Sequence, residues 1–364
     1  MSYLDTIKTA IIVFPIIAFV FTFPFILHQY HKYGSINSFR VLIIYSFILY
    51  MMVIYFLVIL PLPNKTSITK PISEMINLVP FSFISDFIKE SSFVLTDPKT
   101  YFKAITEPCV YTVVFNIFMT IPFGMYLRYY FKCNLKKTIV FSFLLSLFFE
   151  VTQLTGLYFI YSSPYRLFDV NDLIMNTLGG FFGYHLMGFV ENYLPTRKEI
   201  DEKALKKGNK VSGLRRITVF CLDFLVFLTI SLLIAMFFNN DYMIIVVFIV
   251  YYILIPYLLN GKTFGGSFLN VRLIFSNYKF LNMTFRILFL YFYYFVLPIV
   301  FMFGSFLFNR YFNLNGTQSI WIYLMVLFII IIFYLSHLLI IVKNKKIYYD
   351  KFFKVSYEST IISD

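Results

Sequence analysis

A glutamate inside an apolar stretch is the first residue in this sequence for which chemistry is expected. Glu150 lies in the run SLFFEVTQ, and Gln153 follows three residues later, on the same face if the run is helical. A charged side chain at the centre of a membrane-spanning helix costs about 2.5–3.5 kcal/mol on insertion scales. Glu150 therefore needs a hydrogen-bonding partner or a function.

A second polar group follows in the segment YRLFDVNDLIMNTLGGFFG. Asp169, Asp172, Asn176 and Gly179 are separated by three, four and three residues, which places them on one face of a helix. Either aspartate can also cap the N-terminus of that helix. Gly179 and Gly183 form a G-x-x-x-G motif, so we expect a neighbouring helix to approach closely here.

These groups are candidates for one polar cavity that opens to the outside. Asn116 is expected at a depth of about 12 Å from the outer boundary, and Glu150 at about 15 Å. Arg166 precedes the aspartates and suits an anionic group, whereas the carboxylates suit a cation, a sugar hydroxyl or a proton. The alternative is structural: the amides and Glu150 join helices through hydrogen bonds, while Arg166 and the aspartates form ion pairs and a helix cap. Both interpretations remain open.

The second half of the chain carries fewer charged candidates. Arg216 and Asp223, in GLRRITVFCLDF, are seven residues apart and share one helix face. Asp350 lies in KIYYDKFFKV, among basic and aromatic residues that suit a membrane surface. Arg216 is either a cytoplasmic anchor or the ion-pair partner of Asp223 or Asp350, and an ion or proton pathway through Asp223 is a further alternative. The glycine-rich segment NGKTFGGSFLNVRLI lacks the residue order of a phosphate-binding P-loop.

Composition determines the elements that must position these residues. The chain is 60% hydrophobic and 13% charged, whereas a soluble domain is about 25% charged. Runs of about 20 apolar residues cross a bilayer as helices. We therefore predict an all-α, polytopic membrane protein with about nine transmembrane helices, near residues 9–27, 41–60, 108–127, 138–160, 173–194, 217–238, 242–259, 287–308 and 320–342.

The basic residues indicate the topology. Most of the 31 lysines and arginines lie in alternate loops, as the positive-inside rule requires of cytoplasmic loops. We predict an N-terminus outside, a C-terminus in the cytoplasm, and short surface helices in the external loop 61–107. The expected domains are 1–194 and 215–364, joined by a charged cytoplasmic linker, 195–214. The net charge of +13 is thereby assigned to the membrane surface and not to nucleic acid.

The motifs of the first half resemble the VanZ-like family over residues 10–192. The resemblance rests on NIFMTIPFG around Asn116, on SLFFEVTQ, and on RLFDVNDLIMNTLGG. Residues 210–358 resemble the RDD family, named for one arginine and two aspartates, which match Arg216, Asp223 and Asp350. Gly261, Thr263 and Gly265 resemble that family's G-x-T-x-G loop, although Gly266 stands where a lysine often follows.

The VanZ-like resemblance implies a membrane protein that lowers susceptibility to teicoplanin-type glycopeptides, without an established reaction. The combination of the two families is typical of Gram-positive bacteria, which implies a location in the plasma membrane. The expected partners are membrane lipids and a lipid-linked envelope precursor or lipoglycopeptide. Some RDD proteins have been proposed as ion transporters, so a secondary ion or proton transporter is the second hypothesis. The third is an intramembrane lipid-modifying enzyme in which Asp169 and Asp172 hold Mg²⁺. We expect no cofactor, metal or nucleic acid, and the oligomeric state is left open.

Overall fold

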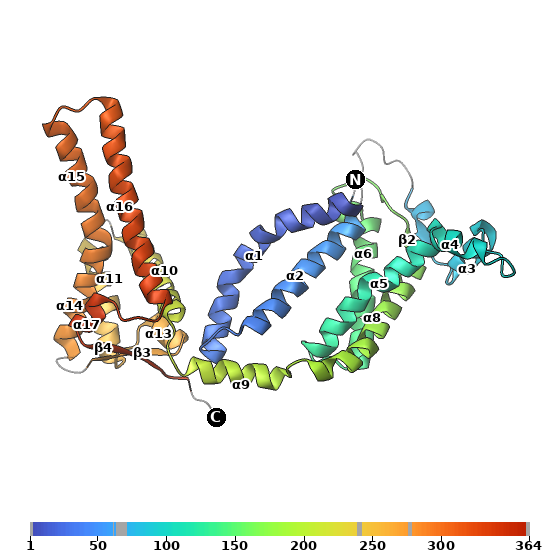
Figure 1. The fold of residues 1–364 in the computed structure, drawn as a ribbon, viewed down its shortest axis with the longest axis horizontal. Coiled ribbons are helices and arrows are strands. Elements are labelled where there is room, and N and C mark those ends of the chain that lie inside the picture. The colour runs from blue at the N-terminus through green and yellow to red at the C-terminus, as the bar shows by residue number, and fades with distance from the viewer. Residues whose placement is uncertain (1–2, 61, 63–70, 239–241, 276–278, 362–364) are drawn as a thin grey trace. The chain divides into compact units, whose positions relative to one another are not determined.

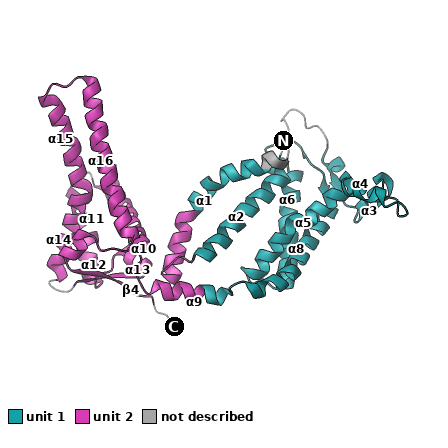
Figure 2. Cartoon of the chain, viewed as in Figure 1, with its two compact units in different colours: residues 1–21, 38–200 teal, residues 22–37, 201–364 magenta. Residues whose placement is uncertain are grey.

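The computed structural model describes residues 3–60, 62, 71–238, 242–275 and 279–361. These residues form two compact units, which Figure 2 shows in different colours. Unit 1 comprises residues 1–21 and 38–200, and unit 2 comprises residues 22–37 and 201–364. The first helix, α1 (Tyr3–Tyr33), contributes residues to both units. Most of the predicted linker is helical, as α9 (Arg197–Gly208).

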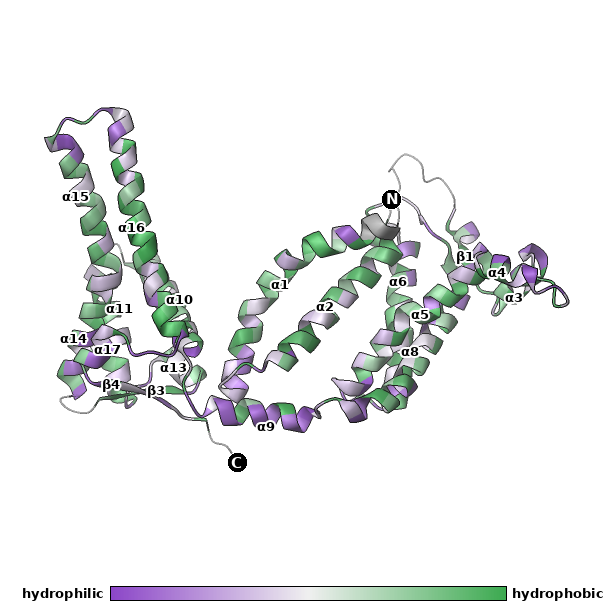
Figure 3. Ribbon diagram, viewed as in Figure 1, coloured by the Kyte–Doolittle hydropathy of each residue, from purple (hydrophilic) through white to green (hydrophobic). Residues whose placement is uncertain are grey.

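Apolar helices dominate both units, as the hydropathy colouring of Figure 3 shows. Within the described residues, eight helices are long and apolar enough to cross a membrane, and a shorter apolar helical segment spans Tyr242–Leu258. The prediction of an all-α membrane protein is therefore confirmed, with eight full-length helices where nine were expected. The difference lies at 242–259, where the described helix is too short and contains Pro256. The orientation in the membrane stays a prediction.

Unit 1 is built around three closely packed helices, α5 (Pro108–Tyr129), α6 (Leu135–Leu154) and α8 (Val170–Val190) (Figure 1). Asn134 caps α6 by accepting a hydrogen bond from the N–H of Lys137. The remaining elements are α2 (Ser38–Ile59), η1 (Ile72–Met75), β1 (Ile76–Asn77), α3 (Ser82–Glu90), α4 (Lys99–Ile105), α7 (Gly156–Phe159), β2 (Phe168–Asp169) and η2 (Glu191–Tyr193). The short helices predicted in the loop 61–107 are thus present among its described residues as η1, α3 and α4.

Glycines explain the close packing of α8. A Cβ at Gly183 would lie 2.0 Å from the carbonyl oxygen of Ile121, and a Cβ at Gly179 would lie 2.1 Å from the hydroxyl oxygen of Thr120. No larger residue leaves room for α5 at this distance. The close approach predicted from the G-x-x-x-G motif is confirmed.

Unit 2 combines long helices with a small sheet, which was not predicted from the sequence. Strands β3 (Val271–Phe275) and β4 (Val355–Ser359) pair antiparallel, with Val271 opposite Ser359. The helical elements are α10 (Gly213–Phe237), α11 (Tyr242–Ile249), η3 (Val250–Leu254), α12 (Ile255–Leu258), α13 (Phe264–Phe268), α14 (Lys279–Tyr291), η4 (Phe292–Val296), α15 (Leu297–Tyr311), α16 (Gly316–Val342) and α17 (Tyr348–Phe352).

Candidate functional site

The predicted residues of the first half do converge, through hydrogen bonds between α5, α6 and α8. Asn116 on α5 donates from Nδ2 to Oδ1 of Asp172 on α8, at 2.6 Å. Asn176, one turn further along α8, donates from Nδ2 to the hydroxyl of Ser146 on α6, at 2.9 Å. The Ser146 hydroxyl in turn donates to the backbone carbonyl of Asp172. Each helix of the bundle thus contributes polar groups to one network.

Glu150 on α6 is bonded to the start of α8, the helix that carries Asp172 and Asn176. Its Oε2 accepts a hydrogen bond from the backbone N–H of Asp169, at 3.0 Å. Asp169 is the N-cap of α8, because its Oδ1 accepts the N–H of Asn171 at 2.8 Å. The predicted capping role of an aspartate is therefore confirmed for Asp169 and not for Asp172.

Arg166 and Gln153 meet at the end of α2. The carbonyl oxygen of Val58 accepts from Nε2 of Gln153 and from Nη1 of Arg166, both at 2.8 Å. Arg166 also donates from Nη2 to the carbonyl of Leu60, at 3.1 Å. The last carbonyls of a helix have no partner within it, so this arginine satisfies them. Its observed hydrogen bonds are to backbone oxygens, and not to the carboxylates considered from the sequence.

The described part of the loop 61–107 is attached directly to Asp169 and Asn171. Strands β1 and β2 pair parallel, with Asn77 opposite Asp169. Asn77 donates from Nδ2 to Oδ2 of Asp169 at 3.2 Å, and the N–H of Phe81 donates to Oδ1 of Asn171 at 2.6 Å. Asn77, Asn171 and Ser146 were missed as site residues. Asn171 lies inside the quoted motif RLFDVNDL, whereas Asn77 carries no local signal.

Burial separates the set into a deep part and an accessible part. Glu150 is 3% exposed, Asn176 3% and Gln153 4%, so the deep residues are enclosed by protein. Arg166, Asp169 and Asp172 are only partly buried. Oδ1 of Asn176 is buried without a hydrogen-bond partner in the described structure. A ligand that approaches from the protein surface would therefore meet the Arg166, Asp169 and Asp172 groups first.

The geometry does not favour a metal centre. Among the described residues, no group of three or more His, Cys, Asp and Glu side chains is placed to hold a metal ion. Asp169 and Asp172 already accept hydrogen bonds from Asn77 and Asn116. The arrangement suits hydrogen bonding to a polar group better than it suits the Mg²⁺ considered above.

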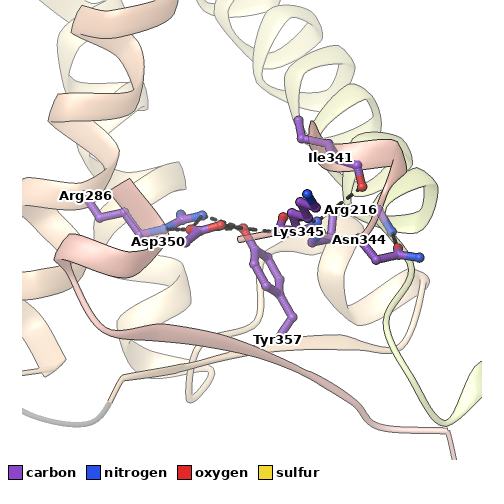
Figure 4. A network of polar contacts seen from close by, with 8 residues as sticks. Arg216, Arg286, Ile341, Asn344, Lys345, Asp350 and Tyr357 are labelled. Atoms are coloured by element: carbon purple, nitrogen blue, oxygen red, sulfur yellow. Dashed lines mark hydrogen bonds and ion pairs between the residues drawn. The ribbon is translucent and has the colours of Figure 1, made fainter. Parts of the chain in front are cut away.

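The polar residues of the second half form two separate groups. Arg216 lies 3.7 Å from Oδ2 of Asp350, and Arg286 donates to Oδ1 of Asp350 at 3.0 and 3.1 Å (Figure 4). Tyr357 donates from its hydroxyl to Oδ2 of Asp350 at 3.0 Å. Burial raises the pKa of the Tyr357 phenol, so this hydroxyl keeps its proton. Of the two ion-pair partners considered for Arg216, the structure shows Asp350.

Asp223 has other partners. Its Oδ1 accepts from the Tyr251 hydroxyl at 2.8 Å and from the N–H of Gly265 at 2.7 Å, and its Oδ2 accepts from the Thr263 hydroxyl at 2.6 Å. The glycine-rich segment therefore binds a carboxylate of the same chain.

In the second half of the chain, two buried arginines were not identified from the sequence. Arg286 was counted only as a cytoplasmic charge, and it is 6% exposed. Arg215 is fully buried and donates to the backbone carbonyls of Gly34, Gly208, Leu269 and Asn270. The adjacent arginines of GLRR mark this region as important, but the sequence does not indicate which of the two is buried.

The comparison with known families bears on the first site. Residues 47–191 match the VanZ/LLP1 family model. This range is less than half of the chain, and it contains all seven candidate residues of the first half. No curated protein and no solved structure matches the chain. With the eight apolar helices, the match indicates a multi-pass membrane protein of the cell envelope. No comparison supports an RDD domain in the second half, and that resemblance stays a prediction.

Proposed function

We propose that unit 1 binds the polar group of an amphiphilic or lipid-linked ligand at Arg166, Asp169 and Asp172, and thereby modulates susceptibility to teicoplanin-type glycopeptides. The observation that carries this proposal is that the VanZ-like match coincides with the hydrogen-bonded network of α5, α6 and α8. Buried hydrogen bonds that hold partly accessible side chains in fixed positions are suited to binding a ligand without rearrangement of the site.

The chemistry of the three groups indicates the kind of ligand. Asp169 and Asp172 are hydrogen-bond acceptors that suit hydroxyl or ammonium groups, and Arg166 is a cation next to them. A glycan head group or a glycopeptide offers both hydroxyl donors and anionic oxygens. The apolar helices on either side offer a surface for the ligand's acyl chain. We infer a binding function, with no reaction assigned.

The test is the teicoplanin susceptibility of a host that carries the wild-type chain, a variant or an empty vector. Wild type should protect, and Asp172→Ala and Arg166→Ala should lose protection at equal membrane abundance. Glu74→Ala is the matched control, because Glu74 is an exposed carboxylate of η1, directly before the strand β1 that pairs with β2. Equal susceptibility with wild type and empty vector would refute the proposed function. Loss of protection in Glu74→Ala would refute the assignment to this site.

Besides the buried carboxylate of Glu150, the transporter hypothesis is supported by the buried carboxylate of Asp223. Its two oxygens accept three hydrogen bonds, so it has a structural role without any transport. We therefore keep transport as the alternative. Proteoliposomes that show no pH-dependent cation or proton flux would eliminate it.

A further inference from the structure

Unit 2 contains a cavity of about 350 Å³ among α10, β3, α14, η4 and α16. Its walls are mainly apolar and include Phe220, Leu290, Leu338 and Ile341. This volume lies in the range of small-molecule sites, which are typically apolar with a few polar groups that orient the ligand. The cavity belongs to unit 2 alone and shares no residue with the site proposed above.

The polar end of this cavity is formed by the two arginines that share Asp350. Arg216 and Arg286 both line the cavity, and both guanidinium groups contact the single Asp350 carboxylate (Figure 4). The side chain of Arg216 is 10% exposed, and its Nε is buried without a hydrogen-bond partner among the described residues. A buried donor without a partner costs about 1–3 kcal/mol, so an acceptor oxygen in the cavity would relieve an existing penalty.

Asp223 also lines the cavity, and its charge must be considered. Both of its oxygens are already bonded, to Tyr251, Thr263 and Gly265. Hydrogen bonds to a carboxylate stabilise its charge locally. At the Arg216 end, by contrast, the buried group without a partner is a hydrogen-bond donor, the Nε of Arg216. The unfilled requirement at the Arg216 end of the cavity is therefore an acceptor oxygen, and an anionic one suits the two guanidinium groups beside it.

The side of the cavity formed by η4 and α16 carries exposed apolar residues. Phe295 is 38% exposed, Tyr334 41% and Leu338 44%, and all three line the cavity. They lie on helices of membrane-spanning length and hydropathy, so their exposed surface faces hydrocarbon. From Tyr334 to the end of α16 at Val342 there are eight residues, or about 12 Å of helix. The cavity thus runs from the Arg216 and Arg286 groups into the depth of the bilayer.

We propose that this cavity binds an anionic membrane lipid. Its acyl chain enters between η4 and α16, and a phosphate oxygen of its head group accepts a hydrogen bond from Nε of Arg216. The two guanidinium groups supply the positive charge, and Tyr357 stacks under Arg216, with 4.8 Å between Cζ and the ring centroid. This proposal is independent of the proposed function of unit 1.

The experiment uses the full chain, purified in detergent and titrated with phosphatidylglycerol, with phosphatidylcholine of the same acyl chains, or with inorganic phosphate. Bound lipid is counted by native mass spectrometry. We expect phosphatidylglycerol to bind at least about tenfold more tightly than phosphatidylcholine, a difference of about 1.4 kcal/mol. Inorganic phosphate should neither bind measurably nor displace the lipid.

Two variants locate the site. Leu338→Trp fills the apolar cavity and should weaken phosphatidylglycerol binding at least about tenfold. Leu335→Trp is the matched control: Leu335 lies on the same helix, is 51% exposed and does not line the cavity. Arg216→Lys keeps the positive charge beside Asp350 but removes Nε, and should also weaken binding. Folding of every variant is checked by its size-exclusion profile.

The outcomes separate the alternatives. Selective loss of phosphatidylglycerol in Leu338→Trp and Arg216→Lys, with Leu335→Trp unchanged, supports the proposal. Equal binding of phosphatidylcholine overturns anion recognition. Displacement of the lipid by inorganic phosphate identifies a simple anion site and overturns the lipid assignment. Binding that is the same in all three variants and wild type overturns the location.

Discussion

The backbone N–H of Asp169 donates a 3.0 Å hydrogen bond to the buried carboxylate of Glu150. One residue lies in the last two turns of α6, and the other caps α8. This bond therefore connects the interior of the bundle with the partly exposed aspartates at its edge, where β2 pairs with β1. Glu150 is best understood as a positioning residue for the Asp169 and Asp172 surface.

Replacing Glu150 should separate its acceptor role from its charge. Glu150→Gln keeps an oxygen that can accept from the Asp169 N–H, whereas Glu150→Ala leaves that donor unpaired. We therefore expect Glu150→Ala to lower the free energy of unfolding by about 1–3 kcal/mol more than Glu150→Gln does. Thermal unfolding in detergent measures both. Equal destabilisation by the two substitutions would contradict this role.

The packing of α8 against α5 predicts a strong effect of a single methyl group. A Cβ at Gly183 would lie 2.0 Å from the carbonyl oxygen of Ile121, so Gly183→Ala must separate the helices, at a cost of about 1–3 kcal/mol. Gly304→Ala is the control, because no atom lies within 4 Å of its Cβ position on α15. Thermal unfolding should show the first variant destabilised and the second unchanged or more stable. The same unfolding temperature for both would show that the close contact does not matter.

Arg215 should be the arginine of unit 2 that tolerates substitution least. A lysine has one nitrogen in place of the planar fork that reaches four backbone carbonyls. We expect Arg215→Lys to cost at least about 3 kcal/mol, through buried carbonyls left unpaired. The folded yield after detergent extraction is the measurement. As a control, Arg310→Lys, at an exposed position, should change the free energy of unfolding by no more than about 0.5 kcal/mol. A comparable loss of stability in Arg215→Lys and Arg310→Lys would contradict a special role of Arg215.

Asp223 offers a test of transport that does not depend on unfolding. In Asp223→Asn the amide oxygen can still accept from Gly265 and Tyr251, and the amide nitrogen can donate to Thr263, so we expect a stability change of less than about 1 kcal/mol. Asp223→Ala leaves these donors unpaired and should cost about 1–3 kcal/mol. Proton or cation flux that is present in wild type and absent in the stable Asn variant would favour the transporter hypothesis. Flux retained in the Asn variant would exclude the Asp223 charge from any pathway.

The amino-acid sequence determined the features that depend on neighbours along the chain. Runs of apolar residues specified membrane-spanning helices because every backbone polar group must be satisfied within lipid. The spacing of Gly179 and Gly183 specified a face for close packing, and the position of Asp169 specified a helix cap. The spacing of Asp172 and Asn176 likewise placed both side chains toward α5 and α6.

Which distant groups meet depends on how the helices and strands pack in three dimensions. Arg166 binds the carbonyls at the end of α2, more than 100 residues away in the chain. Arg216 pairs with Asp350 and not with Asp223, although Asp223 shares its helix, because the β3–β4 pair and α17 bring Asp350 and Tyr357 to it. Helical periodicity indicates which side chains share a face. The partner of a buried charge depends on how separate elements pack, and this packing cannot be read from a local sequence pattern.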